Sequence, residues 1–217
     1  VASGTLPDGK PVVVNSDGTV SVVSSTGINV TQAVGSATVF ESATTEAGAG
    51  VFDSSNNKVV LSYRDEGNSN YGTAIVGTID DTTITFGTPV VFQSADTAAN
   101  FPIAGAFDSS NNKVVFAYQQ GSSDGKAVVG TVSGTSISFG SSVNFHSSRS
   151  FDVCAAFDSS NNKVVIGFRS NSQSEYGRAI VGTVSGTSIS FGTSVVFNSA
   201  YSGNMSCCFS PDASKVV

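Results

Sequence analysis

A nine-residue sequence, Phe-Asp-Ser-Ser-Asn-Asn-Lys-Val-Val, occurs three times in this chain of 217 residues, at Phe52–Val60, Phe107–Val115 and Phe157–Val165. A divergent copy lies at Phe209–Val217, and a shorter one at Leu6–Lys10. The copies follow one another at intervals of about 50 residues, which is the length of a four-stranded sheet and not of a helical repeat. The repeat therefore predicts an all-β array of similar sheets, each burying its faces against its neighbours.

The charge of the chain and the length of its apolar stretches limit the partners that it can bind. Charged residues make up 12% of the chain, and the formal net charge is -6. An acidic chain with few cations neutralises little phosphate, so we expect no nucleic-acid partner. No apolar stretch approaches the roughly 20 residues that span a bilayer, and no basic segment followed by an apolar one marks a signal peptide, so we expect no membrane insertion.

One repeat can be divided into strands by its turn residues. Short runs rich in β-branched and aromatic residues, bounded by Gly, Asn and Ser, predict strands. In the third full copy these runs are Val153–Phe157, Lys163–Phe168, Arg178–Val184 and Ser188–Phe191, and the last is expected to continue beyond a kink at Gly192 to Phe197. The first strand has small residues in every copy, as expected next to a central channel. We therefore predict a β-propeller built from four-stranded antiparallel blades, present as a partial array.

The repeat divides the chain into five segments. We predict a degenerate first blade at residues 1–46, blades at 47–102, 103–152 and 153–204, and the start of a fifth blade at 205–217. The two ends of a closed propeller commonly complete one blade together. Here both ends would supply a second strand, so we expect the sequence to be a piece of a longer chain whose further blades close the ring.

The segment Asp-Ser-Ser-Asn-Asn joins the first strand to the second in each full copy. Asp and Asn side chains bond to their own backbone and accept left-handed geometry, so this segment predicts a tight hairpin. Calcium binding by Asp53, Asp108 and Asp158 is the alternative, but each loop offers one carboxylate where Ca²⁺ takes six to eight oxygens. No His or Cys spacing suggests zinc, and we expect neither a metal nor a cofactor.

Two copies resemble known repeats. The sequence Phe-Ser-Pro-Asp-Ala-Ser-Lys-Val-Val at Phe209–Val217 is similar to the signature of Tol-type propeller repeats, and so is Leu-Pro-Asp-Gly-Lys at Leu6–Lys10. The near-identical copies and the opening segment also resemble repeat-containing virion and tail-fibre proteins of marine tailed phages. The first resemblance implies a propeller fold, and the second implies a virion or extracellular location. No catalytic motif accompanies either one.

The copies differ mainly in two kinds of connection. Residues 64–73, 119–125 and 169–177 join the second strand to the third, whereas residues 41–46, 93–101, 146–152 and 198–204 lead to the next repeat. Because neighbouring strands run in opposite directions, both kinds of connection lie at the same end of the strands, and the hairpins lie at the opposite end. We call the end with these connections the variable edge. Loops on a rigid scaffold commonly carry binding function, so we predict a binding face there; drift in unconstrained loops is the alternative.

The variable connections carry aromatic and basic side chains. Aromatic faces, guanidinium donors and nearby hydroxyl and amide groups suit a sugar ring or a protein epitope. The predicted ligand-binding residues are Arg64, Asp65, Tyr71, Phe101, Arg149, Phe151, Arg169, Tyr176, Arg178 and Tyr201. Packing of each aromatic against its own sheet remains open, above all for Tyr71 and Tyr176, which occupy equivalent positions before a glycine.

The sequence offers no catalytic constellation. The acids of the variable connections are scattered, at Asp65, Glu66, Asp96, Asp124, Asp152 and Glu175. Gly121–Gly125 matches Gly-x-Ser-x-Gly, but that motif needs a strand-to-helix turn, and strands are expected on both sides here. His146 is the only histidine, and the equivalent residues of the other copies are Glu41, Gln93 and Asn198. We therefore expect no catalytic residues.

The three cysteines, Cys154, Cys207 and Cys208, form no spaced framework. Cys207 and Cys208 align with Ala155 and Ala156, so we predict small buried thiols, with a disulfide as the alternative.

Together these features predict a non-catalytic recognition or adhesion module on a virion or extracellular surface, as in a phage tail fibre. The expected partners are a cell-surface glycan or protein receptor, other virion or filament subunits, and further copies of this chain. Two alternatives remain open: a purely architectural virion or surface-filament subunit, and a glycan-cleaving propeller.

Overall fold

A computed structural model describes residues 12–15, 17–22, 35–97, 102–172 and 174–217. The chain divides into two compact units, Val1–Gly35 and Ser36–Val217. The described part of the first unit is a hairpin in which β1 (Val12–Val14) pairs with β2 (Val20–Val22). The copy of the repeat at Leu6–Lys10 and the ligand candidate Phe101 lie outside the described residues.

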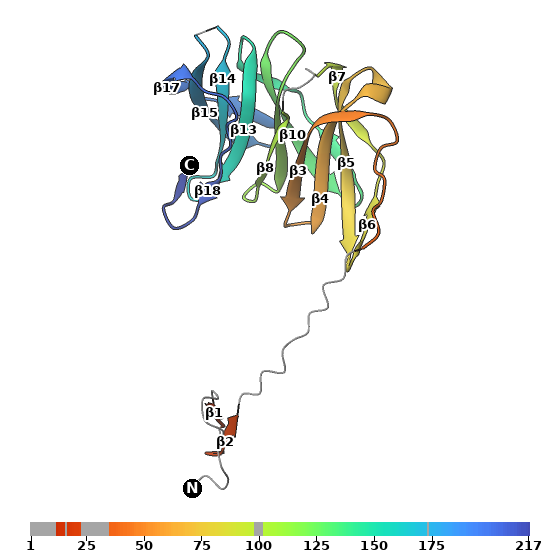
Figure 1. Cartoon of the computed structure of the whole chain (residues 1–217), viewed down its shortest axis with the longest axis vertical. Helices are drawn as coiled ribbons and strands as arrows, with labels where there is room; N and C mark the ends of the chain where they lie inside the picture. Colours follow the sequence, from red (N-terminus) through yellow and green to blue (C-terminus); the bar gives the residue numbers. More distant parts are fainter. Residues whose placement is uncertain (1–11, 16, 23–34, 98–101, 173) are drawn as a thin grey trace. The chain divides into compact units, whose positions relative to one another are not determined.

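The second unit contains three antiparallel sheets with the same strand order (Figure 1). Sheet I consists of β3 (Thr45–Asp53), β4 (Lys58–Asp65), β5 (Tyr71–Asp80), β6 (Thr83–Phe86) and β7 (Val90–Asp96). Sheet II consists of β8 (Ala104–Asp108), β9 (Lys113–Gln119), β10 (Gly125–Ser133), β11 (Ser136–Phe139) and β12 (Val143–His146). Sheet III consists of β13 (Ser150–Asp158), β14 (Lys163–Ser170), β15 (Tyr176–Ser185), β16 (Ser188–Phe191) and β17 (Val195–Tyr201). A short 3-10 helix, η1 (Glu66–Asn68), is the one helical element among the described residues.

The structure confirms the all-β prediction, and it refines the fourth strand. In each sheet the third strand pairs with the second on one side and with two separate strands on the other, so the sheets have five strands. Across the described residues these sheets do not close into a ring. The break between the last two strands falls at Gly87, Gly140 and Gly192. A Cβ at Gly87 would collide with the Thr135 carbonyl of sheet II, and one at Gly140 with the Thr187 carbonyl of sheet III. The glycines therefore allow neighbouring sheets to approach.

Each of the three sheets receives one phenylalanine, from the preceding part of the chain, between two of its own aromatic rings. Phe92 of β7 contacts Phe116 and Phe139 of sheet II at ring-centroid distances of 5.7 and 5.5 Å. Equivalent trios are formed by Phe145 with Phe168 and Phe191, and by Phe40 with Tyr63 and Phe86. Phe116 and Phe168 are fully buried. These contacts carry the apolar core from one sheet to the next.

The invariant hairpins bond to themselves and to one another. Asp53 accepts hydrogen bonds from the Ser55 and Asn56 amides, both 3.0 Å, and from Asn56 Nδ2 at 2.8 Å. Asp108 and Asp158 cap their turns in the same way, so the predicted hairpin chemistry is confirmed. In addition, the Ser55 hydroxyl donates to Asn112 Oδ1 at 2.5 Å, and Ser110 donates to Asn162 in the same way. The motif therefore also links neighbouring sheets.

The strands extend further into the variable connections than the sequence predicts. Strands β3 and β13 begin at Thr45 and Ser150, while β7 and β17 continue to Asp96 and Tyr201. The pairing is interrupted by register shifts, for example between Phe151 and Cys154. A bulge of this kind re-aims side chains without ending the strand, so part of the variable edge is ordered sheet.

Sheet III has a partly uncovered apolar side. The last strands, β18 (Phe209–Ser210) and β19 (Lys215–Val216), pair with each other and contact β13. Over the rest of this side, Val195 and Phe197 of β17 are 61% and 59% exposed. Phe197 occupies the same repeat position as Phe92 and Phe145, whose rings are inserted into the following sheet.

Candidate functional site

Four of the predicted ligand-binding residues meet at the variable edge of sheet III. The guanidinium of Arg169 lies over the rings of Phe151 and Tyr201, with its carbon 4.6 and 4.8 Å from their centroids. The guanidinium of Arg149 also lies over the Phe151 ring, at 5.0 Å. We call these four residues, Arg149, Phe151, Arg169 and Tyr201, the arginine–aromatic ladder. Cation–π contacts of this kind fix the rings and the guanidiniums in one arrangement.

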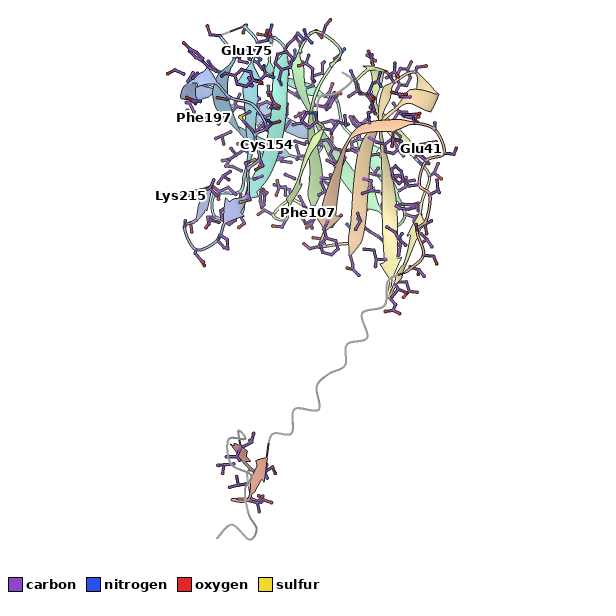
Figure 2. All side chains as sticks on the ribbon, in the orientation of Figure 1. Glu41, Phe107, Cys154, Glu175, Phe197 and Lys215 are labelled. Atoms are coloured by element: carbon purple, nitrogen blue, oxygen red, sulfur yellow. The ribbon has the colours of Figure 1, made fainter. Side chains whose placement is uncertain are left out.

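Two carboxylates hold the central arginine of the ladder. Arg169 Nε lies 2.7 Å from Asp152 Oδ2, and its Nη1 lies 3.1 Å from Glu175 Oε1. The Arg169 side chain is 12% exposed. Figure 2 shows Glu175 at the upper edge of the second unit, whereas Lys215, which follows the last hairpin, lies lower in the view. Two guanidiniums and two carboxylates balance, so the charges of the ladder and its partners cancel.

A bulge in β13 places Asp152 beneath the ladder. Asp152 has left-handed backbone geometry, with φ 50°, and it falls within the register shift between Phe151 and Cys154. Its second carboxylate oxygen accepts a hydrogen bond from the Asn204 amide at 3.2 Å. Ala47 and Asn204 stand at the same repeat position and are also left-handed. The carboxylate thus joins sheet III to the segment that follows it.

Tyr201 is the member of the ladder that solvent reaches. Its side chain is 65% exposed, whereas Phe151 is 6% exposed. Tyr201 pairs with Tyr176 across β17 and β15, which places its ring at the end of the sheet. A ring that is fixed on one side by a cation and open to water on the other can stack on an apolar or sugar surface at little cost in side-chain entropy.

Arg64 lies at the position equivalent to Arg169 in sheet I, but it is buried. It donates from Nε to the Thr97 carbonyl at 2.8 Å and from Nη1 to Glu66 Oε1 at 2.8 Å and Glu46 Oε2 at 3.2 Å. Asp65, the next residue, is 7% exposed, as is Arg64 itself. Arg64 therefore ties connections together, and the structure exposes little of either side chain to a ligand.

The remaining candidates take other positions. Tyr71 and Tyr176 are half-buried first residues of β5 and β15. Arg178 lies on β15 rather than in a loop, and it donates to the hydroxyl and the carbonyl of Ser194 at 2.8 and 3.3 Å. The sequence analysis predicted each member of the ladder as a separate candidate. It did not indicate that Asp152 and Glu175 belong with them, because these acids come from connections on either side of β14.

His146 is a packing residue at the boundary between sheets II and III. Its ring contacts Phe168 at 5.0 Å, its Nδ1 lies 3.0 Å from the Ser150 hydroxyl, and its Nε2 lies 3.2 Å from the Ser170 hydroxyl. Burial lowers the pKa of this histidine below its ordinary 6.5. Burial disfavours the charged form of an imidazole, so the folded chain prefers it neutral.

Because the folded chain prefers neutral His146, we expect the free energy of unfolding to depend on pH through this residue. The unfolded chain binds the proton more readily than the folded chain, so the free energy of unfolding should fall as the pH drops through 6.5 towards the lower folded-state pKa. His146→Gln, which places the residue of the equivalent position 93, should remove this change. Urea unfolding between about pH 5.5 and 7.5 measures it. A parallel loss of stability in both proteins would contradict the assignment.

Most of the candidate catalytic acids pair with arginines, and Asp152 and Glu175 both pair with Arg169, at 2.7 and 3.1 Å. Glu66 and Asp96 lie around Arg64, whereas Asp124 accepts a hydrogen bond from Asn144 Nδ2 at 2.9 Å. Ser123, in the Gly-x-Ser-x-Gly segment, lies between β9 and β10 and donates to the Gln120 carbonyl at 3.2 Å. Among the described residues no group of three His, Cys, Asp or Glu side chains could hold a metal ion.

The cysteines differ in part from the prediction of buried thiols. All three are free, Cys154 and Cys207 are half-buried, and Cys208 is exposed. Cys208 directly precedes β18, and its backbone exchanges two hydrogen bonds of 2.9 Å with Val217 at the end of the last hairpin.

Comparisons with known proteins gave no match: no family model, no curated protein and no solved structure corresponds to the chain. Over the residues that the structure describes, there is no helix of the length and apolarity needed to span a membrane.

Proposed function

We propose that sheets I, II and III are blades of a β-propeller, and that the chain is a non-catalytic recognition module of a virion or extracellular surface. The observation that carries this proposal is the arginine–aromatic ladder at the variable edge. It is built from the connections in which the repeats differ most, while the hairpins at the opposite end of the strands are built from residues that the repeats share. Regular sheets with varied connections at one edge are how propellers present binding surfaces.

The ladder favours an uncharged cell-surface glycan as the ligand. The exposed ring of Tyr201 offers a flat apolar face, and the hydroxyl and amide groups of Ser202, Asn198 and Asn204 lie in the same segment. Sugar rings have apolar C–H faces and a rim of hydroxyls, which these two kinds of group complement. Because the charges of the ladder are balanced internally, a strongly anionic ligand gains little attraction from it.

Tyr201→Ala should abolish binding of the full chain on an array of cell-surface glycans and leave its folding unchanged. Loss of a central exposed aromatic from an interface commonly costs about 2 kcal/mol or more, a loss of roughly 30-fold in affinity. Phe52→Ala is the matched control, because Phe52 is also exposed, at 53%, but adjoins the invariant hairpin. It should bind like the original protein.

Three results would count against this proposal. Equal binding by the Tyr201→Ala variant would remove the ladder from the site, and loss of binding in the Phe52→Ala variant would place the site at the opposite edge. Release of reducing sugar from a surface polysaccharide by the purified chain would show a glycan-cleaving enzyme instead.

An architectural role is the second candidate, and the uncovered side of sheet III favours it. Val195 and Phe197 lie on the same face of β17 and are 61% and 59% exposed. Burial of such a surface stabilises association between subunits. In that case the chain binds no glycan on the array and assembles through this side of the sheet.

A further inference from the structure

Two cysteine thiols meet on the uncovered side of sheet III. Cys154 of β13 and Cys207, which precedes β18, line the same pocket of about 390 Å³, together with Gly167, Phe197, Met205 and Val217. Figure 2 shows Cys154 and Phe197 on the side of the second unit that carries the chain's last strands. The two thiols lie close enough to shift each other's pKa, whereas Cys208 is exposed.

The repeat has changed at two paired positions to admit the sulfur of Cys154. In sheets I and II the residues equivalent to Cys154 are Ala49 and Ala104, and their cross-strand partners are Ser62 and Ala117. In sheet III the cross-strand partner is Gly167. A Cβ at Gly167 would come within 2.7 Å of the Cys154 sulfur. The glycine therefore provides the space in which the Cys154 sulfur sits beside Cys207.

We propose that Cys154 and Cys207 form a disulfide that ties the segment of β18 and β19 to sheet III. The oxidant is a small-molecule disulfide such as oxidised glutathione. One protein thiolate attacks a glutathione sulfur and releases the first glutathione as a thiol. The second protein thiol then loses its proton and attacks the mixed disulfide, and the second glutathione leaves. Two protein thiols are oxidised, and one glutathione disulfide is reduced to two thiols.

The electrostatics of the pair give the order of these steps. The interaction with Cys207 lowers the pKa of Cys154, while it raises the pKa of Cys207. Cys154 is therefore the thiol that ionises more readily, and we expect it to attack first, because the thiolate and not the thiol reacts. Cys207 is held beside it to resolve the mixed disulfide.

The disulfide would fix a part of the chain that few other contacts hold. Strands β18 and β19 have two residues each, and the described hydrogen bonds that anchor the preceding segment to sheet III include that from the Asn204 amide to Asp152. Structural disulfides persist in oxidising compartments. Formation of the bond in the native protein would thus agree with an extracellular or virion surface, but the inference does not depend on ligand binding.

Thiol counting on the folded, full chain tests the proposal. After treatment with oxidised glutathione and alkylation with N-ethylmaleimide, the chain should take up one maleimide instead of three, since it has three cysteines. Digestion should yield a single cross-linked peptide pair joining Cys154 to Cys207. The Cys208→Ala variant should form the same bond and take up no maleimide after oxidation. The Cys154→Ala and Cys207→Ala variants, which keep two cysteines each, should still take up two maleimides.

These variants are matched to the fold, because alanine already stands at the equivalent positions 104 and 155. Three maleimides on the oxidised wild-type chain, with its mass otherwise unchanged, would overturn the proposal. A bond between Cys207 and Cys208, or disulfide-linked dimers through Cys208, would also overturn it. Persistence of a stable glutathione adduct on Cys154 would show that Cys207 is not placed to resolve it.

Discussion

Replacing Phe116 with alanine is expected to lower the free energy of unfolding by about 3 to 5 kcal/mol, the range for truncation of a buried phenylalanine. Phe116 is fully buried. Its ring lies 5.7 Å from Phe92 of sheet I and 6.3 Å from Phe139 of its own sheet. The substitution therefore leaves a cavity at the point where one sheet inserts its phenylalanine into the next. Equilibrium unfolding in urea measures the change.

Phe52→Ala is the control for this prediction. Phe52 lies at the end of β3 and is 53% exposed, so its removal should change the free energy of unfolding by about 0.5 kcal/mol or less. Equal destabilisation by the two substitutions would show that the aromatic trios do not form the contact between sheets.

Replacing Arg64 with alanine should destabilise the chain by about 3 kcal/mol. Removal of one partner from a buried ion pair costs about 3 to 5 kcal/mol, because it leaves the other charge buried and unpaired. Here Glu46 and Glu66 are 35% and 36% exposed, so water compensates part of that loss. The hydrogen bond to the Thr97 carbonyl is lost as well. These terms place the effect at the lower end of the range.

Removing the charges of the acids as well separates the cost of unpaired carboxylates from the cost of the lost hydrogen bond to Thr97. Arg64→Ala combined with Glu46→Gln and Glu66→Gln should recover part of the lost stability, since no unpaired carboxylate remains. Lys58→Ala serves as the control, because Lys58 makes a single described hydrogen bond, to the Thr78 hydroxyl at 2.9 Å. If the Arg64→Ala variant is as stable as the original chain, the contacts of Arg64 do not stabilise the fold.

The repeat predicted much of the fold because its residues determine local structure, namely the strands and turns within one sheet. Alternating apolar residues and the Asp-Ser-Ser-Asn-Asn turn define strands and hairpins within one sheet, and the structure places both where they were expected. Contacts between sheets could not be predicted in this way. The link from Ser55 to Asn112 joins two copies of one motif, and its sequence signal is the same as that of the turn itself.

The candidate site was predicted in composition but not in arrangement. Arg64 and Arg169 occupy the same repeat position, and nothing in the sequence distinguishes their roles. Their partners separate them: Arg64 is buried beneath carboxylates and a backbone carbonyl, whereas Arg169 also stacks on Tyr201, which is 65% exposed. Those partners come from distant connections whose proximity depends on bulges and left-handed residues such as Asp152.

The central claim is that the shared residues build the sheets while the varied residues recognise a ligand. Amide hydrogen exchange of the full chain, with and without the tightest-binding glycan of the array, tests it most directly. The claim predicts slower exchange in residues 146–152 and 198–204 upon binding, with no change in the hairpins at residues 53–57, 108–112 and 158–162. Slower exchange in the hairpins, with the ladder segments unaffected, would contradict it.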